Sequence, residues 1–173
     1  DSFSDGGRFN DVALALAHCE ELLAQGADIL DLGAESTRPG AQALPLEQEL
    51  PRLMPVLAEA VKLGVPISVD TYKPEVMQAA LDAGADIIND IWALRYQPQR
   101  VGGPSGADVV VAHPTCGVCL MHMHRDPQSM QALPMAGNVP PQVVTFLEQR
   151  SQYLKAMGVS SNRIFVDPGI GFG

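Results

Sequence analysis

Three polar side chains each end a short apolar run, and their types suit one kind of ligand. They are Asp70, Asn89 and Asp167. A carboxylate can accept hydrogen bonds from two adjacent N–H groups of a planar heterocycle, much as it does from a guanidinium. An amide presents a donor and an acceptor to the same ring edge. Together these residues favour a flat, nitrogen-rich ring such as a pterin, guanine or cytosine, although each carboxylate alone could instead cap a helix or a turn.

A second polar stretch, residues 32–40, reads Leu-Gly-Ala-Glu-Ser-Thr-Arg-Pro-Gly and follows another apolar run. Arg38 offers a planar fork of donors suited to a phosphate or carboxylate, and Thr37 adds a hydroxyl beside it. Pro39 stiffens the segment. The stretch is typical of an anion-binding site at the end of a strand. The alternative is a polar loop in which Arg38 forms a surface ion pair.

Helical patterns separate these polar ends. Apolar side chains recur at helical spacing, and a glycine follows most of the patterns. Pro51 and Pro55 interrupt the second pattern, so we expect its first part to be a separate turn. Residues 109–112 fit a helix or a strand, and we favour a helix because a clear strand follows closely. The expected helices cover residues 10–25, 46–63, 74–83, 109–112 and 143–157.

Strands that alternate with helices indicate a parallel sheet with crossover connections. The expected strands are 28–32, 65–70, 85–90, 118–122 and 163–167. An open doubly wound sheet and a closed barrel both fit this order. Polar residues at the end of every strand favour the barrel, whose active site lies at that face. These end residues are Asp31, Asp70, Asn89, His122 and Asp167. We therefore expect an incomplete TIM (β/α)8 barrel of about five strands, forming a single domain over residues 1–173.

The net charge of −9 argues against nucleic acid or an anionic membrane as a partner, because both need basic faces. The three cysteines indicate reduced thiols and a cytoplasmic location. Cys116 and Cys119 have the spacing of a redox motif, and nearby histidines could add zinc ligands. Because no second paired motif is present, we interpret Cys119 as a small buried side chain and Cys116 as an exposed thiol. The sequence His122–His124 also resembles the metal-binding pair of hydrolytic barrels, a more distant alternative.

In this order the motifs resemble those of the bacterial dihydropteroate synthases, and the resemblance covers essentially the whole chain. The matching segments are residues 1–7, 35–40, 68–71, 88–90, 119–123 and 167–173. That family has a TIM-barrel fold. It joins 6-hydroxymethyl-7,8-dihydropterin diphosphate to p-aminobenzoate, and it is the target of sulfonamides. This sequence departs from the usual family pattern at His124, Arg125 and Ile170.

The resemblance implies roles for individual residues. Asp70, Asn89 and Asp167 would hold the pterin ring, Met121 would line its pocket, and Asp31 is a weaker candidate there. Thr37 and Arg38 would act as catalytic residues beside the diphosphate and the aminobenzoate. Phe3 and Pro39 would belong to loops that close over the aminobenzoate. Because Phe3, Thr37 and Pro39 match the usual family residues, we expect a sulfonamide-sensitive form.

Other parts of the family site would lie outside this chain. The asparagine that binds Mg²⁺ would precede Asp1, so no metal ligand is expected within the chain itself. The last strands, further diphosphate ligands and the homodimer interface would follow Gly173. We therefore expect the 173-residue chain alone to be an inactive fragment. Two alternatives remain open: a pterin-dependent methyltransferase, which should lack the 35–40 motif, and a pterin-binding module without transferase activity.

Overall fold

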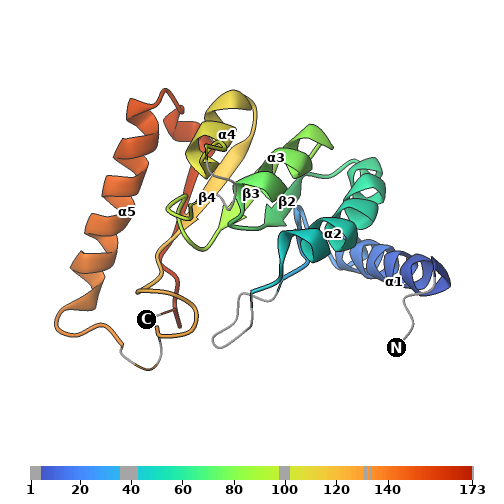
Figure 1. Ribbon diagram of the computed structural model, residues 1–173, viewed down its shortest axis with the longest axis horizontal. Helices are drawn as coiled ribbons and strands as arrows, with labels where there is room; N and C mark the ends of the chain where they lie inside the picture. The colour runs from blue at the N-terminus through green and yellow to red at the C-terminus, as the bar shows by residue number, and fades with distance from the viewer. Residues whose placement is uncertain (1–4, 36–42, 98–101, 131, 133, 173) are drawn as a thin grey trace.

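A computed structural model describes residues 5–35, 43–97, 102–130, 132 and 134–172. Helices and strands alternate along the chain (Figure 1). The order is α1 (Asp5–Ala24), β1 (Leu30–Gly33), α2 (Leu46–Ala60), the 3-10 turn η1 (Val61–Leu63), β2 (Ile67–Asp70), α3 (Pro74–Asp82), β3 (Ile87–Asp90), α4 (Gly106–Ala112), β4 (Gly117–Met121), α5 (Val139–Ala156), the 3-10 turn η2 (Ser161–Arg163) and β5 (Ile164–Asp167).

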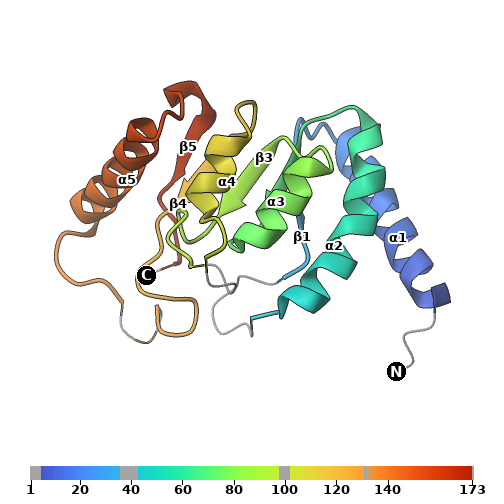
Figure 2. The ribbon, with the colours of Figure 1, turned by 45° about the horizontal axis from the view of Figure 1, so that its top comes forward.

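The five strands form one parallel sheet in the order β1-β2-β3-β4-β5. Each strand therefore pairs with the next one in the chain, and a helix makes the crossover between them. Figure 2 shows the helices side by side in front of the sheet, with α1 and α2 near β1 and α5 near β5. Strands that pair in sequence order belong to a barrel wall rather than to a doubly wound sheet. The α/β fold and the partial barrel are thus confirmed.

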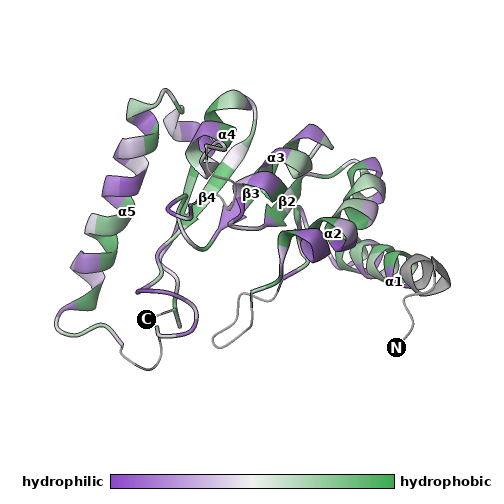
Figure 3. Cartoon of the chain, viewed as in Figure 1, coloured by the Kyte–Doolittle hydropathy of each residue, from purple (hydrophilic) through white to green (hydrophobic). Residues whose placement is uncertain are grey.

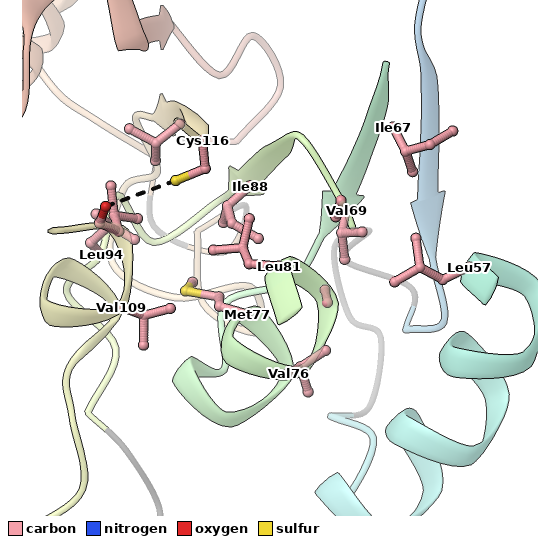
Figure 4. Close-up of a cluster of buried hydrophobic side chains, with 14 of the residues drawn as sticks. Leu57, Ile67, Val69, Val76, Met77, Leu81, Ile88, Leu94, Val109 and Cys116 are labelled. Atoms are coloured by element: carbon pink, nitrogen blue, oxygen red, sulfur yellow. Dashed lines mark hydrogen bonds between the residues drawn. The ribbon is translucent and has the colours of Figure 1, made fainter. Parts of the chain in front are cut away.

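The core lies between the helices and one face of the sheet (Figure 4). Val69, Ile88 and Val118 form a row across β2, β3 and β4, and all three side chains are fully buried. Leu57 of α2 and Met77 of α3 pack in the same cluster. Figure 3 shows hydrophilic and hydrophobic stretches alternating along α2 and α5, as expected for helices with one buried face. None of the described helices combines the length and apolar character that a membrane crossing needs.

Most of the expected helices are confirmed, and α4 is one of them. Its N-terminus carries a capping box: the backbone N–H of Asp108 donates to the Ser105 hydroxyl at 3.2 Å, and the Asp108 carboxylate accepts the backbone N–H of Ser105 at 2.9 Å. Two expectations were wrong. The first helix begins at Asp5 rather than at Asn10. In the second expected helix, residues 46–60 form one continuous helix rather than a turn followed by a helix.

Helix α2 tolerates its two prolines because of where they lie. Pro51 and Pro55 are four residues apart on the exposed side of the helix. The carbonyl groups that lose their N–H partners there can be hydrated by water. The opposite side of the helix buries Leu53 and Leu57 against the core. Burial of that face therefore outweighs the local cost of the prolines.

Candidate functional site

The predicted ring-binding residues lie on the face of the sheet that points away from the core. Asp70 is in register with Asn89, and Met121 is in register with Asp167. Residues in register on parallel strands point to the same face, and alternate residues point to the other face. Because the alternate residues form the buried core row, these four side chains share the opposite face, at the carboxyl ends of β2 to β5. The predicted set is thus brought together.

Asp31 belongs to the same face but not to the same level. Strand β1 continues to Gly33, which is in register with Asp70, whereas Asp31 is in register with Ser68. The expectation that Asp31 ends its strand was therefore wrong. Its carboxylate still reaches the site, because the Asn89 side-chain amide donates a hydrogen bond to Asp31 Oδ2 at 3.1 Å. Asp31 thus orients the Asn89 amide from a position two residues before the strand end.

Cys119 is also on this face, between Asn89 and Phe165 in register. Burial raises the pKa of its thiol to about 11, and the charges of Asp167, Asp31 and Asp90 raise it further. The thiol therefore stays protonated near neutral pH. Cys116, in contrast, is buried and only 3% exposed. The expectation that Cys116 is exposed was thus wrong, whereas Cys119 is partly buried, and both are free thiols.

His122 follows β4 but turns away from the site. Its ring is buried and packs edge-on against Phe146 of α5, with ring centroids 5.1 Å apart. Burial lowers the pKa of His122, and the charge of Arg95 lowers it further. The His122 ring is therefore part of the contact between the sheet and α5. His122 thus lies at the end of β4 as expected, but its side chain does not join the polar face.

The turn after β5 holds Asp167 closely against β4. The His122 N–H donates to the Asp167 carbonyl at 2.8 Å, and the Gly169 N–H donates to Asp167 Oδ1 at 2.8 Å. Gly169 has φ of +65°, and a Cβ atom built there would lie 1.9 Å from the His122 carbonyl oxygen. Only glycine fits this position without a shift of the backbone.

The turn after β3 is held by a buried carboxylate. Asp90 is fully buried and accepts the N–H groups of Trp92 at 2.8 Å and Leu94 at 2.6 Å. Burial raises the pKa of Asp90 to about 6, although these two N–H groups lower it. Ala93 and Leu94 both have positive φ, and Arg150 of α5 donates to the carbonyl of Ala93 at 2.9 Å. This strained turn follows the end of β3, and Asn89 is the last but one residue of that strand.

A buried lysine adjoins the same edge of the sheet, and the sequence patterns did not single it out. Lys73 lies three residues after Asp70, and its ammonium group is paired with the carboxylates of Glu35 and Glu49. All three side chains are almost completely buried. A lysine next to a helix-starting proline looks like a surface residue, and its partners are 38 and 24 residues away. No local pattern could have predicted this cluster.

Four of the predicted site residues lie outside the described part of the chain: Phe3, Thr37, Arg38 and Pro39. Within the described part, no group of three or more His, Cys, Asp or Glu side chains is arranged to hold a metal ion.

The described site is an acidic face at the strand ends, with the acceptors of Asp70, Asn89 and Asp167 beside the apolar side chain of Met121. Such a face can bind the N–H edge of a planar heterocycle.

Known proteins share both the sequence and this fold. The dihydropteroate synthase of Neisseria meningitidis serogroup B is 45% identical over 175 residues, covering 100% of this chain and 59% of the relative. The Burkholderia cenocepacia dihydropteroate synthase structure complexed with 7,8-dihydropteroate is 48% identical with a TM-score of 0.83, covering 94% of this chain and 55% of that one. The Yersinia pestis dihydropteroate synthase structure with a sulfonamide drug is 36% identical with a TM-score of 0.86, covering 99% and 60%.

These matches cover nearly the whole chain but little more than half of each relative, so the chain spans about 59% of the length of the curated relatives it matches. Residues 1–173 also match the family described as pterin binding enzyme. This match includes all three strand ends whose acceptors point away from the core. The chain therefore belongs to the pterin binding enzyme family.

Proposed function

We propose that the full-length protein is a dihydropteroate synthase of folate biosynthesis. It would condense 6-hydroxymethyl-7,8-dihydropterin diphosphate with p-aminobenzoate and release 7,8-dihydropteroate and diphosphate. The observation that carries this proposal is the shared face of Asp70, Asn89 and Asp167 at the carboxyl ends of three strands. Relatives that are 36–48% identical and named dihydropteroate synthase add support.

The spacing of the strands suits a two-ring heterocycle. Asp70 and Asn89 are on adjacent strands, about 5 Å apart, and Asp167 is two strands beyond Asn89, about 10 Å away. The Asp70 and Asp167 carboxylates accept hydrogen bonds from ring N–H groups, and the Asn89 amide supplies a donor and an acceptor. The hydrogen bond from Asn89 to Asp31 fixes which way that amide points. Met121 contributes an apolar surface beside the ring.

The chemical step is a substitution at the pterin methylene group. The carbon–oxygen bond to the diphosphate breaks, the arylamine nitrogen forms the new carbon–nitrogen bond, and the nitrogen releases a proton. The ring acceptors hold the methylene in place, while Thr37 and Arg38 stabilise the leaving diphosphate. No covalent enzyme intermediate is needed. A protonated Cys119 thiol with a pKa of about 11 fits this scheme, because only the thiolate is a strong nucleophile.

The full-length protein would also need a metal ion and a second subunit. Mg²⁺ would be held by a residue upstream of Asp1. The full-length protein would be a cytoplasmic, sulfonamide-sensitive homodimer. Its partners would be its small-molecule substrates rather than nucleic acid or membrane, in keeping with the net charge of −9.

Turnover by the full-length protein tests the proposal. We expect dihydropteroate to form from pterin diphosphate and p-aminobenzoate, and Asp70→Asn to weaken pterin binding by about 10- to 100-fold through loss of a charged acceptor. Asp28→Asn is the matched control, because Asp28 is exposed and precedes β1 at the other end of the sheet. Pterin binding without any product would refute the synthase and favour a binding module. Methyl transfer from a methylated pterin would favour the methyltransferase.

A further inference from the structure

The ammonium group of Lys73 joins three parts of the fold. Lys73 lies in the turn between β2 and α3, and its side chain is 1% exposed. It pairs with the carboxylate of Glu35, just after β1, and with that of Glu49, in the first turn of α2. In sequence, Glu35 and Glu49 stand on either side of residues 36–42.

Every carboxylate oxygen in this cluster has a partner. Lys73 takes one oxygen of each glutamate. The Tyr72 hydroxyl donates to the other oxygen of Glu35 at 2.7 Å, and the Thr71 hydroxyl donates to the other oxygen of Glu49 at 2.9 Å. The Lys73 ammonium also lies 4.5 Å from the centre of the Tyr72 ring. Such a fully paired network allows one arrangement of its members.

Stability alone does not account for a network of this kind. Removing three charges from water costs several kcal/mol for each ion, and apolar side chains of similar size are often as stable in the same place. Burial lowers the pKa of Lys73, but hydrogen bonds and charges from Glu35 and Glu49 outweigh that effect and raise it. Lys73 is therefore charged, and what the network provides is a fixed geometry for the groups that meet on it.

The location of the network indicates which geometry matters. Thr71, Tyr72 and Lys73 directly follow Asp70, which ends β2. The network thus fixes the end of β1 and the start of α2 relative to the strand end that holds the ring. Thr37 and Arg38 lie between these two fixed points in the sequence.

We propose that Lys73 is a positioning residue that, through Glu35 and Glu49, fixes the end of β1 and the start of α2 for the diphosphate and aminobenzoate part of the reaction. This assignment rests on the proposed synthase function. Lys73 does not contact the reacting atoms, so its effect is on the second substrate and the leaving group. Binding of a free pterin, which needs only the strand-end acceptors, is independent of it.

Glu49→Gln in the full-length protein tests this role. Lys73→Met would leave two buried carboxylates without a cation and could prevent folding. A glutamine side chain instead keeps the shape of the glutamate and an oxygen for the Thr71 hydroxyl. We expect kcat/KM for aminobenzoate to fall about 10- to 100-fold, as for a small misplacement of reacting groups, while the Kd of 6-hydroxymethylpterin stays within about twofold. Amide hydrogen exchange over residues 43–50 should become about tenfold faster.

Glu59→Gln is the matched control. Glu59 is on the same helix and also pairs with a lysine, Lys62, but the two side chains are 46% and 64% exposed. It should change neither exchange nor kinetics. A Glu49→Gln enzyme with normal kcat/KM, or with pterin and aminobenzoate affected equally, would overturn the positioning role.

A failure of the proposed function has a different signature. If the wild-type protein gives no dihydropteroate, the synthase proposal fails, but the role of Lys73 is still decided by two measurements. Glu49→Gln should then speed exchange over residues 43–50 and weaken the binding of inorganic diphosphate by about tenfold or more, leaving free pterin binding intact. Unchanged exchange and unchanged diphosphate binding would refute the positioning role itself.

Discussion

Gly169→Ala is the substitution for which the structure predicts the sharpest effect. Gly169 follows Asp167 by two residues and has φ of +65°. A Cβ atom there would lie 1.9 Å from the His122 carbonyl oxygen and 3.3 Å from Met121 Cγ. The atom in the way belongs to the backbone just after β4, which the parallel pairing of β4 and β5 holds in place. The turn must therefore shift away from β4 and take the Asp167 side chain with it.

Two costs contribute to the expected loss of stability. An alanine in the left-handed region costs about 1–2 kcal/mol. Displacing packed backbone costs about 1–3 kcal/mol more, as in other overpacked interiors. We expect the free energy of unfolding to fall by about 2–5 kcal/mol in total. The hydrogen bond from the Gly169 N–H to Asp167 Oδ1 is lost with the shift, so pterin binding should weaken by about 10- to 100-fold.

Gly64→Ala separates the two costs. Gly64 has a similar φ of +76°, but a Cβ atom there meets nothing within 4 Å. It follows η1, at the other end of the sheet from the site. Urea unfolding of both full-length variants measures the stability change, and isothermal titration with 6-hydroxymethylpterin measures ring binding. Gly64→Ala should show only the strain of about 1–2 kcal/mol and normal pterin affinity.

Two results for Gly169→Ala would contradict the predicted effect. If Gly169→Ala loses no more stability than Gly64→Ala, the contact with the His122 carbonyl does not constrain the turn. If its pterin affinity is also normal, the turn does not set the position of Asp167. Either result would contradict the reasoning for that step.

Two further predictions concern pH. Folding raises the pKa of Asp90 from 3.8 to about 6, so the folded protein binds a proton more tightly than the unfolded chain does. The free energy of unfolding should therefore fall by up to about 3 kcal/mol as the pH rises from 4 to 6. Asp90→Asn should remove that pH dependence in urea melts. The Val109 carbonyl and Asp82 raise the pKa of His113, so its contribution is fully present below the ordinary value of 6.5 and is lost as pH rises through the raised value. The free energy of unfolding of the wild-type protein, relative to that of His113→Gln, should be about 0.5–1 kcal/mol larger at pH 5 than at pH 9. Urea melts at both pH values measure this change, and an equal difference at both would refute the pairing with Asp82.

The strand ends were predictable because parallel strands impose a simple rule. A short apolar run between two helices is a buried strand, and all such strands end at the same edge of the sheet. The sequence alone therefore groups Asp70, Asn89 and Asp167. The rule locates a strand end only to within a residue or two. Asp31 was misplaced for that reason, since β1 runs two residues further, to Gly33.

The contacts that support the site could not be predicted in the same way. Lys73 meets carboxylates from two distant segments, and nothing near it in the sequence indicates burial. His122 was expected at the strand end, but its position beside α5 depends on where Phe146 packs. Local patterns identify the groups that face a ligand. Which groups hold them depends on tertiary packing, which one sequence alone does not reveal.

The cluster of Lys73, Glu35 and Glu49 and the turn that holds Asp167 should respond independently to mutation. The Lys73 cluster meets the sheet at β1 and β2, whereas Gly169 lies beyond β5, about three strand spacings, or roughly 14 Å, from β2. Effects at that separation with no shared partners usually add to within about 0.5 kcal/mol. In a double-mutant cycle, Gly169→Ala should weaken pterin binding by the same factor with or without Glu49→Gln. A coupling larger than about 1 kcal/mol would mean that the ring and the aminobenzoate are positioned by one connected element, and that the Lys73 cluster also fixes the ring.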